Sequence, residues 1–215
     1  MIARIGRCLL TGGITVGTLI ATLGTVTTTT SCAPTPSNER VTNILLPDFP
    51  TYSDNVDAYL QRRCGTLDCH GQAGRAYRLY GFAGFRLIDD ADGGLVTGQQ
   101  PTTAAEVLAN YQAAVGLEPE QMSRVVAQQG EDPERLLLLR KPLRLSNGHG
   151  GNERHKGGPA MSQDDDGYRC VIAWLQVRTV RPTADGTDFE IIPQADRQKM
   201  PATSVKNCDV AKNNP

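Results

Sequence analysis

Aromatic side chains are scarce in this chain. They make up 5% of its 215 residues, with one tryptophan, four phenylalanines and six tyrosines. Aromatic residues bury large apolar areas and dominate the energetics of most protein cores. A chain this poor in them is expected to complete a small core with a bound cofactor or a covalent bridge.

The sequence also lacks the motifs of several common enzyme families. It contains no Gly-x-Ser-x-Gly elbow, no phosphate-binding loop and no His-Glu-x-x-His pair. The acidic run Asp164–Asp166 precedes an apolar helical pattern, and carboxylates at a helix start are explained by the helix dipole without paired catalysis. The sequence therefore gives no positive reason to expect a catalyst.

An excess of basic residues is absent too. The chain has 22 lysines and arginines against 23 aspartates and glutamates, for a net charge of −1. A nucleic-acid-binding protein normally carries a basic patch or stripe. Nucleic acid is therefore not expected among the partners.

The first 31 residues contain no acidic side chain, and the first acidic residue is Glu39. Arg4 and Arg7 precede a long uncharged stretch rich in threonine and glycine. A positive start followed by an uncharged stretch is typical of an export signal. The leader therefore predicts a chain that is exported.

The segment TTTTSCAPTPSNER resembles the cleavage site of bacterial lipoproteins, with Ser31 before Cys32 and a polar spacer after it. The resemblance implies that residues 1–31 are a signal peptide and that Cys32 carries the lipid of a periplasmic or outer-membrane lipoprotein. That lipid is the expected contact with a membrane. Thr29 stands where this family usually has leucine. A plain signal peptide and an uncleaved anchor helix therefore stay open, with Cys32 as an ordinary thiol or disulfide partner.

Four cysteines remain once the leader and the lipidated cysteine are set aside: Cys64, Cys69, Cys170 and Cys208. An even number of cysteines outside the cytoplasm normally indicates disulfides. One bridge between Cys170 and Cys208 is therefore expected. The first pair either forms a second bridge or serves another purpose.

The rest of the chain divides by composition. Residues 32–50 are expected to be a linker, 51–180 a helical domain with long loops, and 181–215 a C-terminal extension that Cys208 pins. Apolar spacing and capping signals predict helices that begin near Thr51, Thr103, Pro119, Asp132 and Ser162. A short strand is expected in FEIIPQ, and the residues that follow it are expected to form a loop. The fold class is mainly α.

The stretch QRRCGTLDCHGQAGR carries the strongest chemical signal. Cys64, Cys69 and His70 stand in the order that attaches haem c, with two thiols for the vinyl groups and an adjacent histidine for the iron. Four residues separate the cysteines where the usual motif has two. The longer arch, which Gly65 would help to turn, leaves the Cys69–His70 pair unchanged.

The surroundings of this stretch resemble a small class I c-type cytochrome. A helix precedes Cys64, His-Gly and an apolar "RL" element follow it, and a final helix has the pattern S…Y…V…W-L. Residues 52–176 also resemble predicted bacterial lipoproteins with the pattern CGxLDCHG…RLYG…GFRL and a later KP…HxGG…Y…W. The resemblance implies a cytochrome c-like helical fold, one covalent haem c with iron bound by His70, and single-electron transfer between redox protein partners.

Two alternatives for these residues stay open. Cys64 and Cys69 could form a disulfide in an exported protein, which together with Cys170–Cys208 would make a non-haem structural or binding lipoprotein. Cys64, Cys69, His70 and His155 could instead offer two thiolates and two imidazoles to zinc. The adjacency of Cys69 and His70 makes tetrahedral closure awkward.

The sixth iron ligand has few candidates, since the chain has only three histidines. In the resembled pattern the histidine of HxGG corresponds to His155, with His149 as its closest rival. Met161 and then Met200 are the thioether options. Histidine on both sides of the iron would indicate a lower potential than His/Met ligation. Alternatively, both histidines belong to a solvated polar loop.

The segment after His70 is rich in glycine and arginine. Arginine forks bind carboxylates in a bidentate manner, and Arg75 and Arg78 are the arginines nearest after His70. We expect them to bind the haem propionates, unless they belong to a solvated face with scattered ion pairs. The glycines of this segment predict a loop that lies close to another group.

Overall fold

A continuous helical run is the first helical part of the described chain in the computed structural model. It consists of α1 (Phe49–Thr51), a π-helical segment η2 (Tyr52–Val56) and α2 (Asp57–Cys64). The structure describes residues 43–82, 84–87, 100–144 and 155–214. The proposed signal peptide, Cys32 and His149 lie outside the described residues.

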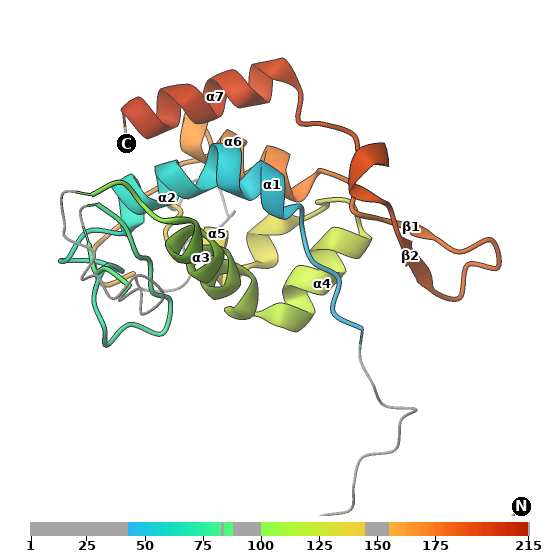
Figure 1. The fold of residues 1–215 in the computed structure, drawn as a ribbon, viewed down its shortest axis with the longest axis horizontal. Coiled ribbons are helices and arrows are strands. Elements are labelled where there is room, and N and C mark those ends of the chain that lie inside the picture. The colour runs from blue at the N-terminus through green and yellow to red at the C-terminus, as the bar shows by residue number, and fades with distance from the viewer. Residues whose placement is uncertain (1–42, 83, 88–99, 145–154, 215) are drawn as a thin grey trace, which may run out of the picture. The chain divides into compact units, whose positions relative to one another are not determined.

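Helices dominate the described residues, as expected (Figure 1). After α2 the chain forms α3 (Ala104–Gly116), α4 (Pro119–Ala127), η3 (Pro133–Arg135), α5 (Leu137–Arg140) and α6 (Asp166–Leu175). The C-terminal part contains β1 (Val180–Pro182), β2 (Phe189–Ile191), η4 (Gln194–Asp196) and α7 (Ala202–Asn213). The prediction of a mainly α fold is confirmed. None of the helices in the described ranges has the length and apolar character needed to cross a membrane.

The first helical run buries the face that its apolar spacing predicts. Tyr52, Val56, Tyr59 and Leu60 are all at most 3% exposed. The capping residue differs from the expected Thr51, because the side chain of Asp48 accepts the hydrogen bond from the Thr51 amide. A carboxylate at this position satisfies an amide that the helix leaves unpaired.

An aromatic cluster fills the centre of the core. The Tyr52 ring lies 5.1 Å from the Trp174 ring and 5.4 Å from the Tyr111 ring. The Trp174 indole donates to the carbonyl of Asp48 at 2.8 Å, and the Tyr111 hydroxyl donates to that of Pro47 at 2.7 Å. The last residues of the expected linker are therefore packed against the domain.

The helices α3 and α4 begin as the sequence predicts. Thr103 and Glu106 form a complete capping box, and Pro119 occupies the first turn of α4. Gly130 follows α4 with a φ of +79°, a conformation that glycine adopts without strain. The expected positions of these two helices are confirmed.

The single helix expected from Asp132 to Pro142 is wrong. The chain forms the short η3, becomes extended at Leu136, and starts again as α5, whose first amide donates to the Glu118 carboxylate at 2.5 Å. Four consecutive leucines cannot all lie on one face of a helix. The extended Leu136 is 1% exposed, so the break buries a side chain that a continuous helix would turn away.

The start of α6 and the C-terminal segment also differ from expectation. Asp165, rather than Ser162, occupies the N-cap position of α6. Its side chain makes no capping hydrogen bond, and its carboxylate accepts from both the amide and the hydroxyl of Ser162. The segment expected to be a loop contains the helix Ala202–Asn213. The buried side chains of this helix are Cys208 and Ala211, which are too small to produce a clear apolar pattern.

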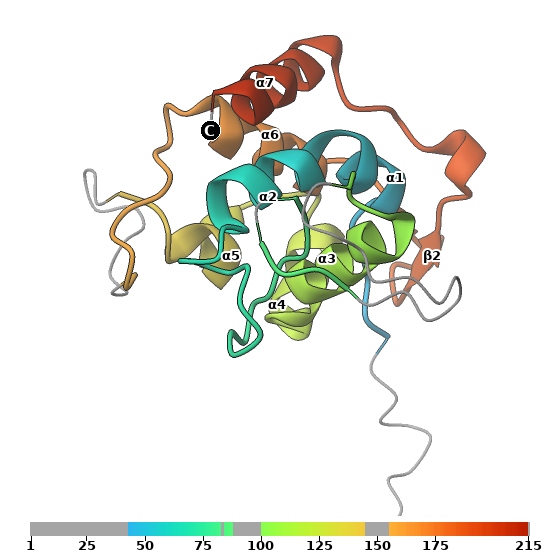
Figure 2. The same cartoon turned by 60° about the vertical axis from the view of Figure 1, so that its left-hand side comes forward.

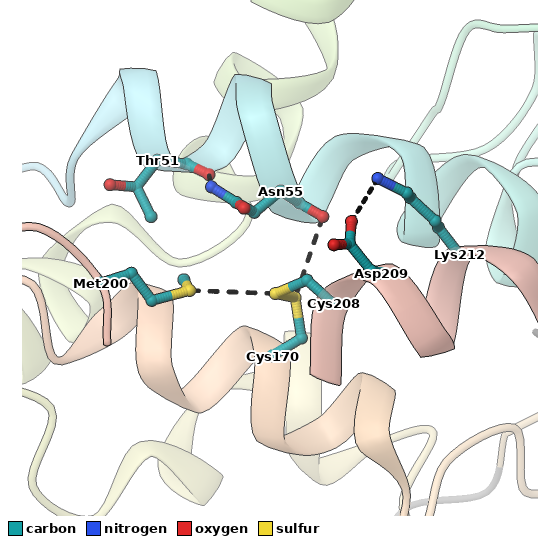
Figure 3. Close-up of a disulfide and its surroundings, with 7 residues drawn as sticks. All are labelled: Thr51, Asn55, Cys170, Met200, Cys208, Asp209 and Lys212. Atoms are coloured by element: carbon teal, nitrogen blue, oxygen red, sulfur yellow. Dashed lines mark hydrogen bonds and ion pairs between the residues drawn. A yellow bond between two sulfur atoms is a disulfide. The ribbon is translucent and has the colours of Figure 1, made fainter. Parts of the chain in front are cut away.

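The predicted disulfide between Cys170 and Cys208 is present and joins α6 to α7 (Figure 3). Both cysteines are fully buried, and the Met200 sulfur lies 3.9 Å from that of Cys208. The two helices pack along each other (Figure 1). The helix α7 of the C-terminal extension therefore packs on the core. The predicted strand in FEIIPQ is also present, and it pairs with β1 as a small antiparallel ribbon.

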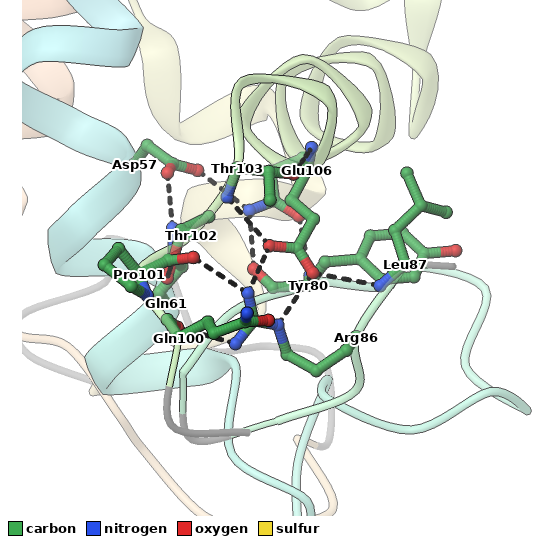
Figure 4. Close-up of polar contacts among 11 residues, drawn as sticks. Asp57, Gln61, Tyr80, Arg86, Leu87, Gln100, Pro101, Thr102, Thr103 and Glu106 are labelled. Atoms are coloured by element: carbon green, nitrogen blue, oxygen red, sulfur yellow. Dashed lines mark hydrogen bonds and ion pairs between the residues drawn. The ribbon is translucent and has the colours of Figure 1, made fainter. Parts of the chain in front are cut away.

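A buried polar network joins α2, α3 and the loop between them (Figure 4). Arg86 forms two charge-assisted hydrogen bonds with Glu106, at 2.8 and 2.9 Å. Asp57, which is 2% exposed, accepts from the amides of Gln61 and Asn110. Burial raises the pKa of Asp57 to about 6, although the two amides oppose this effect.

Loss of the disulfide should destabilise the domain strongly. A double Cys170→Ala/Cys208→Ala variant frees a loop with a sequence separation of 38, which by the chain-entropy argument costs about 3–4 kcal/mol of unfolding free energy. Denaturant unfolding measures this loss. The variant should be insensitive to dithiothreitol, whereas the wild-type protein should lose a similar amount of stability in it. A wild type unaffected by reduction would contradict this.

The buried carboxyl of Asp57 should make stability depend on pH. Its pKa is higher in the folded protein than its ordinary value of 3.8, so the folded state binds the proton more tightly and this contribution is lost as pH rises from about 4 to about 6. Relative to Asp57→Asn, the wild type should lose on the order of 2–3 kcal/mol across that window. Asp54→Asn, at an exposed position of the same helical run, is the matched control: it keeps Asp57 and should lose the same amount of stability as the wild type across that window.

Candidate functional site

The widened cysteine arch begins where α2 ends. The amide of His70 donates to the carbonyl of Cys64 at 2.8 Å, and the amides of Cys69 and Gly71 both donate to the carbonyl of Thr66 at 2.9 Å. These bonds close the arch on itself. Both cysteines and the histidine are therefore held together at the C-terminal end of α2.

Glycine is required where the following loop crosses this arch. A Cβ atom at Gly71 or at Gly84 would stand 2.1 or 2.0 Å from the carbonyl oxygen of Gly65. No side chain fits at such distances. The glycine-rich loop therefore does lie close to another group, and that group is the backbone at the end of α2.

His70 is fixed in one tautomer by its surroundings. Its Nδ1 lies 2.8 Å from the carbonyl oxygen of Tyr77, and its own carbonyl accepts from the amide of Leu79 at 2.9 Å. A carbonyl can only accept, so Nδ1 carries the proton and Nε2 keeps its lone pair. A metal-binding histidine is typically oriented by such a bond.

His155 has the same arrangement. Its Nδ1 lies 2.5 Å from the carbonyl oxygen of Gly158, which again assigns the lone pair to Nε2. The His70 and His155 rings are 6.1 Å apart between centroids, with planes inclined by 25°. Two half-buried imidazoles from distant parts of the chain thus stand beside each other, each with Nδ1 tied to a backbone carbonyl.

Electrostatics keep His70 neutral. Burial lowers its pKa below the ordinary value, and the nearby His155, Arg75 and Lys141 lower it further, against the opposing effect of the Tyr77 carbonyl. A neutral imidazole is the form that binds a metal. The site therefore favours the ligating form of His70 at neutral pH.

The two arch cysteines are free thiols. The alternative bridge Cys64–Cys69 is therefore not formed in this structure, whereas Cys170–Cys208 is. Burial raises the pKa of the Cys64 thiol to about 12, partly offset by Arg63. No group of three metal-ligating histidine, cysteine or acidic side chains is assembled among the described residues, so the four ligands of the alternative zinc site are not brought together there.

The two arginines expected to bind propionates contact the loop itself. Arg75 Nε donates to the carbonyl of Cys69 at 2.9 Å and so supports the arch. Arg78 donates to the Tyr80 hydroxyl at 3.2 Å and to the carbonyl of Ala73. The Nε of Arg78 and the hydroxyl of Tyr77 are buried without a hydrogen-bond partner among the described residues.

The rival ligands to His155 occupy other places. Met161 is 3% exposed and lines a cavity of about 310 Å³ together with Arg63 and Arg144. Met200 packs on the disulfide. His149 cannot be compared, since it lies outside the described residues. Among these candidates, His155 is the one found in ring contact with His70.

The sequence did not reveal the groups that hold the two histidines. The carbonyls of Tyr77 and Gly158 act through the backbone, which carries no residue-specific signal. Lys141 affects the pKa of His70 from beyond α5, and nothing in the sequence connects the two. These contributions depend on the tertiary fold.

The raised pKa should make Cys64 a slow nucleophile. At pH 8 its thiolate fraction is far below that of an ordinary cysteine, so alkylation by iodoacetamide should be about tenfold or more slower than for an unfolded control peptide of the same sequence. Peptide mass spectrometry after timed quenching measures the rate. Equal rates in the folded protein and the peptide would contradict the burial of this thiol.

Comparison of the chain with protein-family models, with curated proteins and with solved structures found no significant match. No activity can therefore be transferred from a relative.

Proposed function

We propose that the chain binds one haem c through Cys64 and Cys69, with His70 and His155 as the axial ligands, and that it transfers single electrons. The observation that carries this proposal is the paired histidines, each with Nδ1 bonded to a carbonyl and Nε2 left with its lone pair. The free thiols beside them are the second requirement for covalent attachment.

The spacing of the two rings supports a shared metal. Metal–imidazole bonds are about 2 Å long, so two imidazoles bound in line to one ion have ring centres about 6 Å apart. The His70 and His155 rings are separated by 6.1 Å. The separation of the ring centres therefore fits one shared metal, to which both Nε2 atoms would have to point.

The number of ligands favours iron in a porphyrin over a bare ion. A structural zinc ion takes four protein ligands, and the described residues assemble no group of even three. A porphyrin supplies four nitrogens of its own and needs two axial partners. The site offers two imidazoles.

Two buried polar atoms also fit this cofactor. The Tyr77 hydroxyl and the Arg78 Nε lack partners within the described part of the chain, and both belong to the segment that holds His70. A buried donor without a partner is costly. The carboxylates of haem propionates are acceptors of the required kind, so Arg78 keeps its proposed role while Arg75 supports the arch.

The residues of the chain would bind and tune the cofactor. The haem supplies the one-electron chemistry. His70 and His155 would provide the ligands, their carbonyl partners would increase ligand basicity, and two imidazoles would favour a lower potential than a His/Met pair. Under this proposal the mainly α domain would be a small class I cytochrome c-like domain, with redox proteins as partners and a lipid on Cys32 as the membrane anchor.

Haem attachment can be tested by expression in a host with haem c maturation. The wild type should gain the mass of one haem and keep its Soret band after denaturation, whereas a Cys64→Ala/Cys69→Ala variant should lose both. His155→Ala should retain covalent haem but lose the six-coordinate low-spin spectrum. Met200→Leu, a change beside the disulfide, is the matched control and should leave that spectrum intact.

A colourless, folded wild-type protein from that host would contradict the proposal. If its mass also showed Cys64 bonded to Cys69, the non-haem lipoprotein with two disulfides would be favoured instead. If haem attached while His155→Ala left the spectrum unchanged, the covalent cofactor would stand and the sixth ligand would be wrong.

A further inference from the structure

Asn110, on α3, is a fully buried polar residue whose amide is almost completely used. Its Oδ1 accepts from the backbone amide of Tyr80 at 2.7 Å, and its Nδ2 donates to the backbone carbonyl of Tyr80 at 2.8 Å. The side chain thus pairs with both polar groups of one residue, as a neighbouring strand would. Tyr80 is fixed in place by this pair of bonds.

The residues next to Tyr80 are those that hold His70. The carbonyl of Tyr77 bonds the His70 ring, and the amide of Leu79 bonds the His70 carbonyl. The segment 77–80 therefore contacts His70 at both its side chain and its backbone. Asn110 anchors the C-terminal end of the same segment.

Asp57 fixes Asn110 from the other side. The second hydrogen of the Asn110 amide donates to Asp57 Oδ1 at 3.0 Å, and Gln61 donates to Asp57 Oδ2 at 2.5 Å. Asp57 and Gln61 belong to α2, the helix that ends at Cys64 (Figure 4). Asn110 consequently connects the helix that carries the first cysteine with the segment that orients the histidine.

We infer that Asn110 is a positioning residue for His70, which it holds in the Nδ1–H tautomer through the backbone of residues 77–80. Its relevance to metal binding rests on the proposed function, because there His70 is the ligand that the tautomer prepares. The inference itself concerns the state of the histidine in the chain without haem. Figure 2 shows the described residues that follow α2, drawn in turquoise and green, beside α2 and α3.

The tautomer of His70 can be measured by ¹⁵N NMR on the full chain produced without haem, at a pH where histidine is neutral. In the wild type, both His70 and His155 should be Nδ1–H. In Asn110→Ala the segment 77–80 loses its anchor, so the Nδ1–H fraction of His70 should fall at least twofold. His155, tied to Gly158, should not change and serves as the internal reference.

Tyr111→Phe is the matched control, since it removes a buried hydrogen bond from the neighbouring residue of the same helix without touching Tyr80. It should leave the tautomer of His70 unchanged.

If Asn110→Ala does not fold, Asn110→Ser, which keeps one hydroxyl near Tyr80, is the second variant. It should lower the Nδ1–H fraction of His70 as well, but by a smaller amount. An unchanged His70 tautomer in a folded Asn110 variant, or an equal change in Tyr111→Phe, would overturn the inference. Failure of the wild type to take up haem would overturn the proposed function and leave this result standing.

Discussion

The hydrogen bond between His70 Nδ1 and the Tyr77 carbonyl is the constraint on which the candidate site depends. It assigns the proton to one ring nitrogen and leaves the other as a lone pair, while burial and neighbouring cations keep the ring neutral. Without it the histidine would be a loop residue after two cysteines. The backbone hydrogen bonds of the arch hold the chain just before His70, and Gly71, just after it, packs together with Gly84 closely against the carbonyl oxygen of Gly65.

Two kinds of interaction hold the frame around that site. Where α7 packs on α6, the disulfide and the small side chain of Ala211 take the place that bulky apolar side chains of α7 would otherwise fill. At the α2–α3 side, buried polar groups do the joining, with Glu106 paired to Arg86 and Asp57 bonded to Asn110. Buried polar networks stabilise a fold only when their members are satisfied, and in return they specify one arrangement of the parts. The loop that carries His70 is fixed in this way.

Capping residues, prolines and apolar spacing in the sequence predicted those helices and strands whose formation depends on neighbouring residues. The capping box of α3, the proline of α4, the apolar face of the first helical run and the β2 strand could all be identified from the sequence. The helix over four leucines broke because burial of Leu136 outweighed helical continuity, and α7 was missed because its buried face is Cys208 and Ala211. Within the site, the cysteines and both histidines could be named in advance, but not the carbonyls that orient them. A backbone acceptor becomes visible only when the fold brings it within reach.

The surroundings of the aromatic and apolar side chains bear on the proposed haem. Tyr52, Tyr111 and Trp174 gather in one aromatic cluster, in which Tyr111 and Trp174 donate to the backbone carbonyls of Pro47 and Asp48. In the stretch that follows α2, by contrast, Leu67 and Phe82 are 58% and 63% exposed. Single exposed apolar side chains are ordinary, but these two lie before and after His70 in the sequence, and the buried hydroxyl of Tyr77, which stands between them in the sequence, has no partner among the described residues. The proposed haem, a flat apolar cofactor with carboxylates at its edge, would cover the exposed apolar side chains and offer the hydroxyl an acceptor.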